Sequence, residues 1–124
     1  MEKTVLIIDD EESIRDILEV LLVDSGYDIL KADSGEEGLE IAINRLPDLI
    51  ILDVMMPKMS GYMVAKHLKA DEHLKHIPII LLTATANVAG NIMLDMPTPY
   101  RLTKPFNPEE LIDMVNNAVK AISN

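Results

Sequence analysis

The chain has 124 residues, of which 48% are hydrophobic and 26% charged, and it carries a formal net charge of -10 with no cysteine. These values are typical of one globular domain and argue against a disulfide framework, a thiolate metal site, and binding to nucleic acid or anionic membrane through the overall field. No apolar run approaches the roughly 18 residues of a membrane span. We therefore expect a cytoplasmic protein with a single domain over residues 1–124 and a tether from about residue 123.

The first half of the chain reads as two strands, each followed by a helix. An apolar run predicts a strand over residues 5–9, and a weaker pattern predicts another over 27–32. Gly26 is suited to end the first helix, while Ser34 and Glu37 have capping-box spacing at the start of the second, which Pro47 closes. The expected buried residues are Ile14, Ile17, Leu18, Leu21 and Leu22 in the first helix and Leu39, Ala42, Ile43 and Leu46 in the second.

The pattern then repeats. A third apolar run over residues 48–53 ends at Asp53, and Ser60 is placed to cap the helix that follows. That helix is expected to bury one face, made of Val64, Ala65 and Leu68. A fourth strand is expected over residues 77–82 and leads into Thr83.

The last third of the chain is less regular. Asn107 and Pro108 open a final helix, whose expected buried face is Leu111, Val115, Ala118 and Ile122. Before it we expect a short helix around 87–95 and a short strand around 100–103, although Pro97 and Pro99 weaken both patterns. The alternation of strands and helices predicts a parallel sheet with right-handed crossovers and helices on both faces.

Acidic residues follow two of these strands. Asp9 and Asp10 come at the end of the first strand, and Asp53 ends the third. Parallel strands present their carboxyl ends at one edge of the sheet, so we expect these three carboxylates to lie together. Such a cluster repels itself unless a hard cation is bound, and Mg²⁺ prefers oxygen ligands of this kind. The sequence therefore predicts a magnesium site.

Five ordered elements resemble the receiver domain of two-component response regulators. They are the acidic pair Asp9 and Asp10, then Asp53, Thr83 and the Lys104-Pro105 step, each at the end of a predicted strand. The resemblance covers the whole chain. It implies a flavodoxin-like (CheY-like), doubly wound α/β fold with five parallel strands in the order 2-1-3-4-5 and helices on both faces.

The resemblance also implies roles for these residues. Asp53 would accept a phosphoryl group from a phosphohistidine, with Thr83 and Lys104 contacting the phosphoryl oxygens. Asp10 and Asp53 would bind Mg²⁺ directly together with the backbone carbonyl of Met55, and Asp9 would act through water. The chain would then be a phosphoacceptor signalling domain that catalyses its own phosphorylation and dephosphorylation, rather than an enzyme. The donor would be a histidine kinase or a histidine phosphotransfer protein, acting on a switch or phosphorelay module.

Its output would reach an unidentified downstream protein or output domain. We expect no direct nucleic-acid or membrane binding by this domain. The surface formed by the expected helix at 87–95, the strand at 100–103 and the final helix is the family's usual site for homodimers and partners.

Each of these residues also has an ordinary structural explanation when taken alone. The acidic pair could open a helix, Asp53 and Thr83 could simply end strands, and Lys104 could be a surface lysine. Their convergence on one sheet edge favours a functional site. The three histidines are expected on the solvated surface, and the methionines near the acids in packing roles; these are His67, His73 and His76, and Met55, Met56, Met59, Met63, Met93 and Met96.

Two alternatives to this function remain open. One is a phosphate-independent interaction module that binds its partner constitutively. The other is a phosphatase with an aspartyl-phosphate intermediate, which is disfavoured because Met55 stands where a second acid would serve as general acid. The side chains of Met55 and Thr85 are expected to flank the path of the water that attacks the aspartyl phosphate, and neither is an effective general base. We therefore predict slow dephosphorylation.

The chain departs from the receiver pattern at residues 84–103, which lack the usual glycine-alanine-acid step. Many receivers place an aromatic switch residue three positions before the lysine, where this chain has Arg101, with Tyr100 one step earlier. Adjacent strand residues face opposite sides, so Tyr100 cannot take that role without a bulge. We hypothesise that the output is read through rearrangement of residues 85–101 instead.

Overall fold

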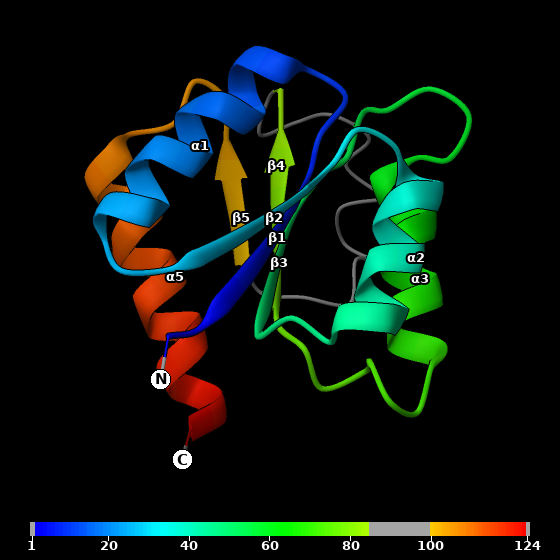
Figure 1. Cartoon of the computed structure of the whole chain (residues 1–124). Coiled ribbons are helices and arrows are strands. Elements are labelled where there is room, and N and C mark those ends of the chain that lie inside the picture. The colour runs from blue at the N-terminus through cyan, green and yellow to red at the C-terminus, as the bar shows by residue number, and fades with distance from the viewer. Residues whose placement is uncertain (1, 85–99, 124) are drawn as a thin grey trace.

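The computed structural model describes residues 2–84 and 100–123 and shows one five-stranded sheet between two layers of helices (Figure 1). The elements are β1 (Thr4–Ile8), α1 (Glu12–Asp24), β2 (Asp28–Ala32), α2 (Gly35–Arg45), β3 (Leu49–Asp53), α3 (Gly61–Ala70), β4 (Ile79–Thr83), β5 (Tyr100–Thr103) and α5 (Pro108–Ser123). All strand pairs are parallel, in the order β2-β1-β3-β4-β5. The flavodoxin-like fold and the strand order are confirmed. The helix expected around 87–95 lies outside the described residues, as do Met93 and Met96.

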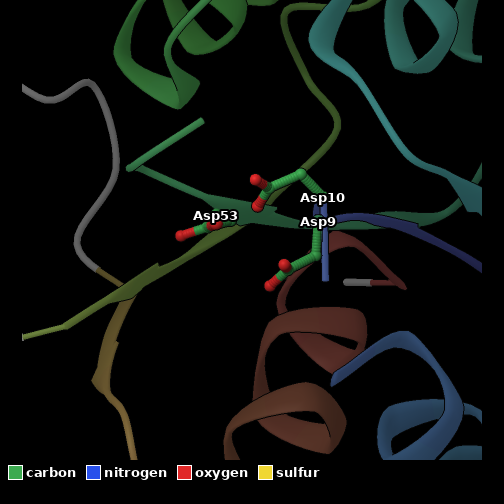
Figure 2. Close-up of side chains that lie close together, drawn as sticks. All are labelled: Asp9, Asp10 and Asp53. Carbon is green, nitrogen blue, oxygen red and sulfur yellow. The ribbon is translucent and has the colours of Figure 1, made fainter. Parts of the chain in front are cut away.

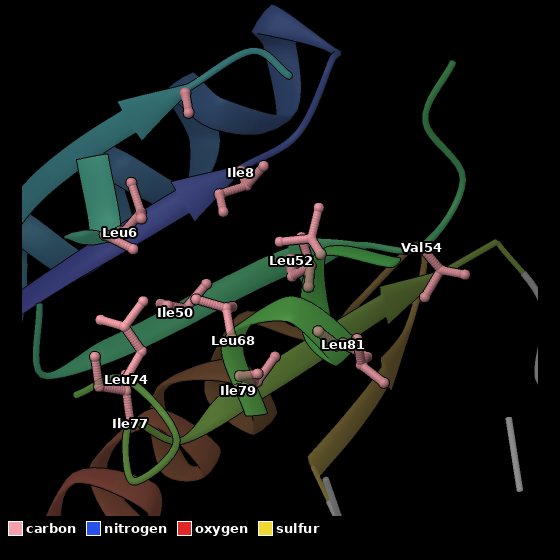
Figure 3. Packing of buried hydrophobic residues seen from close by; sticks show 14 of the residues in the cluster. Leu6, Ile8, Ile50, Leu52, Val54, Leu68, Leu74, Ile77, Ile79 and Leu81 are labelled. Carbon is pink, nitrogen blue, oxygen red and sulfur yellow. The ribbon is translucent and has the colours of Figure 1, made fainter. Parts of the chain in front are cut away.

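The central strands separate two hydrophobic layers. Every residue of β3 and β4 is buried, which explains why these strands read as continuous apolar runs rather than as alternating ones. Successive residues point to opposite faces, so Ile50 and Leu52 pack on the side of α2 and α3, while Leu49 and Ile51 pack on the side of α1 and α5. Figure 3 shows part of the first layer, where Leu68 of α3 lies over the sheet.

Side-chain caps begin three of the helices as predicted. Ser34 Oγ accepts a hydrogen bond from the Glu37 amide at 3.2 Å, and Ser60 Oγ accepts one from the Met63 amide at 3.3 Å. Asn107 Oδ1 accepts from the amides of Glu109 and Glu110, at 2.8 and 3.2 Å. The capping box at α2 differs in one respect, because the Glu37 carboxylate accepts from the Asp33 amide at 2.9 Å and not from that of Ser34.

Three apolar side chains expected to be buried are instead exposed. Ile17 of α1 is 49% exposed, and Ile43 and Leu46 at the end of α2 are 58% and 56% exposed. In α2, small residues set the buried face, which consists of Gly35, Gly38 and Ala42. Leu39 and Ile41 beside this face pack partly against the core, whereas Ile43 and Leu46 lie outside it, so the buried face differs from the one that hydrophobic periodicity predicts.

The surface expectations for the histidines were correct. His67, His73 and His76 are all exposed. The methionines divide into two groups: Met56 is buried and Met59 is half-buried against the core, whereas Met55 and Met63 are 59% and 46% exposed. Among the described residues, no helix has the length and hydropathy needed to cross a lipid bilayer.

Candidate functional site

The sheet brings four predicted site residues to its carboxyl edge. Asp9 follows β1, Asp53 is the last residue of β3, Thr83 is the last of β4, and Lys104 follows β5. The strand register aligns them, because Asp53 pairs with Leu82 and Thr83 with Thr103. The Lys104 amide donates to the Thr83 carbonyl at 2.7 Å, and the Lys104–Pro105 peptide bond is cis.

Three carboxylates lie together at this edge. One oxygen from each of Asp9, Asp10 and Asp53 falls within 4.8 Å of the other two. Figure 2 shows Asp9 and Asp10 at the end of β1 beside Asp53 of β3. Asp9 is 0% exposed and Asp53 is 3% exposed, whereas Asp10 is open to solvent. The cluster therefore has two buried members and one at its rim.

Local backbone contacts hold Asp9 in place. Its Oδ1 atom accepts from the Glu11 amide at 2.9 Å, and its own amide donates to the Ala32 carbonyl at 3.2 Å. The Arg15 guanidinium donates to the Asp9 carbonyl at 2.8 Å. Strand pairing and the first turn of α1 thus fix this acid from both sides.

Asp53 is fixed in a similar way. Its Oδ1 atom accepts from the Met55 amide at 3.2 Å, and the next residue, Val54, donates its amide to the Leu82 carbonyl at 2.9 Å. The Met55 side chain points out to solvent, so the contribution of this residue to the site comes from its backbone.

Lys104 joins the two buried acids. Its Nζ atom lies 3.0 Å from Asp9 Oδ2 and 3.5 Å from Asp53 Oδ1. A third carboxylate, that of Glu11, lies 3.6 Å away at the solvent side. The Lys104 side chain is only 16% exposed, so its charge acts on the carboxylates with little screening by water.

Burial dominates the electrostatics of the pair. Burial and the neighbouring charge of Asp9 raise the pKa of Asp53 to about 6, although Lys104 and the Met55 amide act in the opposite direction. Burial alone would lower the pKa of Lys104, but the contact with Asp9 and the charge of Asp53 raise it overall. At neutral pH the site therefore holds an ionised but poorly solvated Asp53 carboxylate.

The donor set fits a hard divalent cation. Buried Asp9 Oδ2 accepts no hydrogen bond of good geometry within the described part of the chain, although Lys104 lies close to it. An underused buried carboxylate oxygen, in a cluster with two further carboxylates, matches the oxygen-rich ligands that Mg²⁺ prefers.

Sequence reasoning missed two residues of this site, Glu11 and Arg15. Glu11 occupies the N-cap position of α1, and its carboxylate faces Lys104. No sequence signal marked Arg15, because its contact is with a backbone carbonyl. The expected geometry of Tyr100 and Arg101 holds: pairing of β5 with β4 is continuous, and Arg101 is exposed while Tyr100 is half-buried.

Comparison with known proteins then identifies the family. A family model described as the response regulator receiver domain matches residues 5–116. The chain belongs to the receiver domain family of response regulators. Among its relatives is the alkaline phosphatase synthesis transcriptional regulatory protein PhoP of Bacillus subtilis, which is 43% identical over 123 residues, 98% of this chain and 49% of that protein. This receiver domain spans about half the length of the curated relatives it matches.

Solved structures agree with this assignment. A putative response regulator from Chloroflexus aurantiacus has a TM-score of 0.91 and 34% identity, over 97% of this chain and 99% of that one. The receiver domain of the sensor histidine kinase PA1611 from Pseudomonas aeruginosa, solved with a magnesium ion coordinated in its active site cleft, has a TM-score of 0.89 and 25% identity over 97% of this chain and 99% of that one. The receiver domain fold is therefore shared along nearly the whole chain.

Proposed function

We propose that this receiver domain accepts a phosphoryl group from a phosphohistidine on Asp53, in a Mg²⁺-dependent reaction, and thereby acts as a signalling switch or phosphorelay module. The observation that carries the proposal is the meeting of a buried Asp53 carboxylate with the Lys104 ammonium group and two further acids at one sheet edge. Family membership supports the same reading.

The chemistry requires positioning and neutralisation of charge more than proton transfer. A carboxylate oxygen of Asp53 attacks phosphorus, the bond from phosphorus to the donor imidazole breaks, and the imidazole leaves with the bonding electron pair. The pKa of Asp53, raised to about 6, still leaves most of the carboxylate ionised at pH 7, so no general base is needed. Lys104, 3.5 Å from Asp53, is placed to balance charge on the transferring oxygens.

The remaining roles are those that membership of the receiver domain family implies for these residues. Asp10 and Asp53 would hold Mg²⁺ directly with the Met55 carbonyl, and Asp9 would act through water. When bound, the ion supplies positive charge that offsets repulsion between the incoming phosphoryl group and the carboxylates. Thr83, buried at the end of β4, would donate its hydroxyl to a phosphoryl oxygen, and the small neighbouring residue Ala84 would leave room for the group.

The partners belong to the proposal as well. A histidine kinase or histidine phosphotransfer protein would supply the phosphoryl group, as the match to the response regulator receiver domain implies. Output would pass to a downstream protein or output domain, with homodimers forming through β5 and α5; the other part of the expected surface, residues 87–95, lies outside the described residues. We further propose that residues 1–124 form one domain that works in the cytoplasm and itself contacts neither nucleic acid nor membrane.

Labelling with a small phosphodonor tests this function. Purified protein is mixed with phosphoramidate, with and without Mg²⁺, and covalent phosphate is followed by intact mass spectrometry. We expect one phosphoryl group per chain, dependent on Mg²⁺ and absent in the Asp53→Asn variant. Asp28→Asn removes an exposed acid far from the site and serves as a matched control that should label normally. A wild-type chain that takes up no phosphate would instead favour the phosphate-independent interaction module.

A further inference from the structure

Gly61 packs directly against the backbone of Asp53. It is the first residue of α3, and its amide donates to the Val54 carbonyl at 3.0 Å. A Cβ atom built on Gly61 would lie 2.1 Å from the Asp53 carbonyl oxygen and 2.8 Å from both the Asp53 carbonyl carbon and Val54 Cα. These distances are far below a normal contact, so any side chain here would push the helix and the end of β3 apart.

The atoms that Gly61 meets cannot easily move. Asp53 and Val54 belong to the β3–β4 pairing, where the Val54 amide donates to the Leu82 carbonyl at 2.9 Å. The other tightly packed glycines of the described chain face side chains instead. A Cβ on Gly35 would meet Val64 Cγ2 at 2.7 Å, and one on Gly38 would meet Ile8 Cδ1 at 2.4 Å. Side chains can change rotamer, whereas the backbone beside Asp53 has no such freedom.

We propose that Gly61 is a positioning residue for phosphorylation. Because Gly61 has no side chain, the start of α3 can pack against the Asp53 backbone and hold it where the Asp53 carboxylate contacts Lys104. The inference rests on the proposed function of Asp53. The carboxylate is aligned by contacts of 3.2 Å to the Met55 amide and 3.5 Å to Lys104 Nζ, and both depend on where the end of β3 lies. A displacement of about 1 Å in such a site can cost on the order of 100-fold in rate.

Gly61→Ala and Gly35→Ala form a matched pair of variants. Both glycines are the first residue of a helix, both follow a serine N-cap, and the Cβ of Gly35 would press on Val64, in the same helix that Gly61 begins. Labelling by phosphoramidate is measured at saturating donor and Mg²⁺, at a temperature where circular dichroism shows each variant folded. We expect Gly61→Ala to slow labelling about 10- to 100-fold and Gly35→Ala to stay within about twofold of wild type.

A spectroscopic readout separates positioning from general destabilisation. The Met55 amide reports the Asp53 carboxylate directly, so its backbone chemical shift should move in Gly61→Ala and stay close to wild type in Gly35→Ala. Equal labelling rates for the two folded variants, or an unmoved Met55 resonance in Gly61→Ala, would overturn the inference. If the wild type itself is not labelled, the proposed function fails and the role of Gly61 falls with it.

A measurement on the unaltered protein covers the case in which Gly61→Ala does not fold. Loading Asp53 with beryllofluoride and Mg²⁺ should tighten the end of β3 and slow hydrogen exchange at the Gly61 amide, which bonds to Val54. The Gly38 amide, which donates to the Ser34 carbonyl within α2, is the internal reference. Exchange at Gly61 that is unchanged while the beryllofluoride complex forms would count against the coupling.

Discussion

The two ends of β3 carry the same residue type in opposite environments. At the amino end, Asp48 and Thr4 exchange two hydrogen bonds: the Thr4 amide donates to Asp48 Oδ2 at 2.8 Å, and the Asp48 amide donates to the Thr4 carbonyl at 2.8 Å. At the carboxyl end, Asp53 lies beside buried Asp9 and exposed Asp10, and its pKa is raised to about 6. One carboxylate is satisfied by the backbone, and the other is held among like charges.

The difference shows which end serves the fold and which serves the chemistry. Asp48 closes the register between β1 and β3 with neutral donors, so it contributes to stability and gains nothing from a ligand. Asp53 costs stability as long as its charge is buried beside Asp9, and that cost is relieved when a cation or a phosphoryl group with its counterions occupies the edge. Unfavourable electrostatics of this kind are typical of a site that binds a cation or an anion with its counterions.

The largest expected effect comes from removing the positive charge of Lys104 at the carboxyl end of β3. Lys104→Met should reduce the rate of phosphorylation by about 100-fold, because the developing negative charge near Asp53 loses its one protein-borne positive partner in the described site. Lys69→Met is the matched control. Lys69 is also a partly buried lysine, with a pKa lowered by burial, but it donates to the carbonyls of Lys75 and Ile77 below α3. Its loss should cost stability and leave labelling nearly unchanged.

Binding of Mg²⁺ should stabilise the folded chain, because the carboxylate cluster exists only in the native state. At an Mg²⁺ concentration 100 times the dissociation constant, the free energy of unfolding should rise by about 2.7 kcal/mol. Asp10→Asn should weaken this gain, whereas Asp48→Asn should preserve it, since Asp48 lies at the other end of the strand. Thermal melts with Mg²⁺ and with a chelator measure the effect, and equal gains in the two variants would contradict the assignment of the site.

Neutralising the two ends of β3 should shift stability in opposite directions. The folded chain holds a proton on Asp53 more tightly than the unfolded chain does. Protonated Asp53 therefore contributes its full stabilisation at pH values below its ordinary pKa of 3.8, and this stabilisation is lost as the pH rises through about 6. In the absence of Mg²⁺, Asp53→Asn should therefore be more stable than wild type by about 2 kcal/mol at pH 7, with the difference vanishing near pH 4.

At the other end, Asp48→Asn should lower the stability by up to about 1 kcal/mol, because a neutral amide oxygen accepts a weaker bond from the Thr4 amide. Denaturant unfolding of both variants from pH 4 to 8 measures the contrast. A destabilised Asp53→Asn variant at pH 7 would show that this carboxylate is satisfied in its native surroundings.

Most of the fold was predictable because the central strands β1, β3 and β4 are buried on both faces and their apolar runs are uninterrupted. The caps at Ser34, Ser60 and Asn107 could also be predicted, since each depends only on a side chain and an amide two or three residues away. The burial of α2 could not. Its phase is set by close approach through Gly38 to Ile8, a contact between distant segments that hydrophobic periodicity does not encode.

The site shows the same division. Ordered acids and a lysine at strand ends predicted which residues would meet, because parallel strands share one carboxyl edge. Sequence could not predict that Lys104 lies closer to Asp9 than to Asp53, at 3.0 against 3.5 Å, or that Arg15 supports the Asp9 carbonyl. Those details follow from side-chain packing and from backbone acceptors, which carry no residue-specific signal.

The smallest expected effect tests how much of the functional end is scaffold. Ser60→Ala removes the bond to the Met63 amide at the start of α3 and should lower the stability by about 1 kcal/mol, as should Ser34→Ala at α2. Labelling of Asp53 should change by less than about twofold in either variant, because Gly61 and its bond to Val54 still seat the helix on β3. If Ser60→Ala alone slowed labelling strongly, the Ser60 cap as well as the Gly61 contact would position Asp53. Ser60 would then belong to the functional site rather than to the supporting fold.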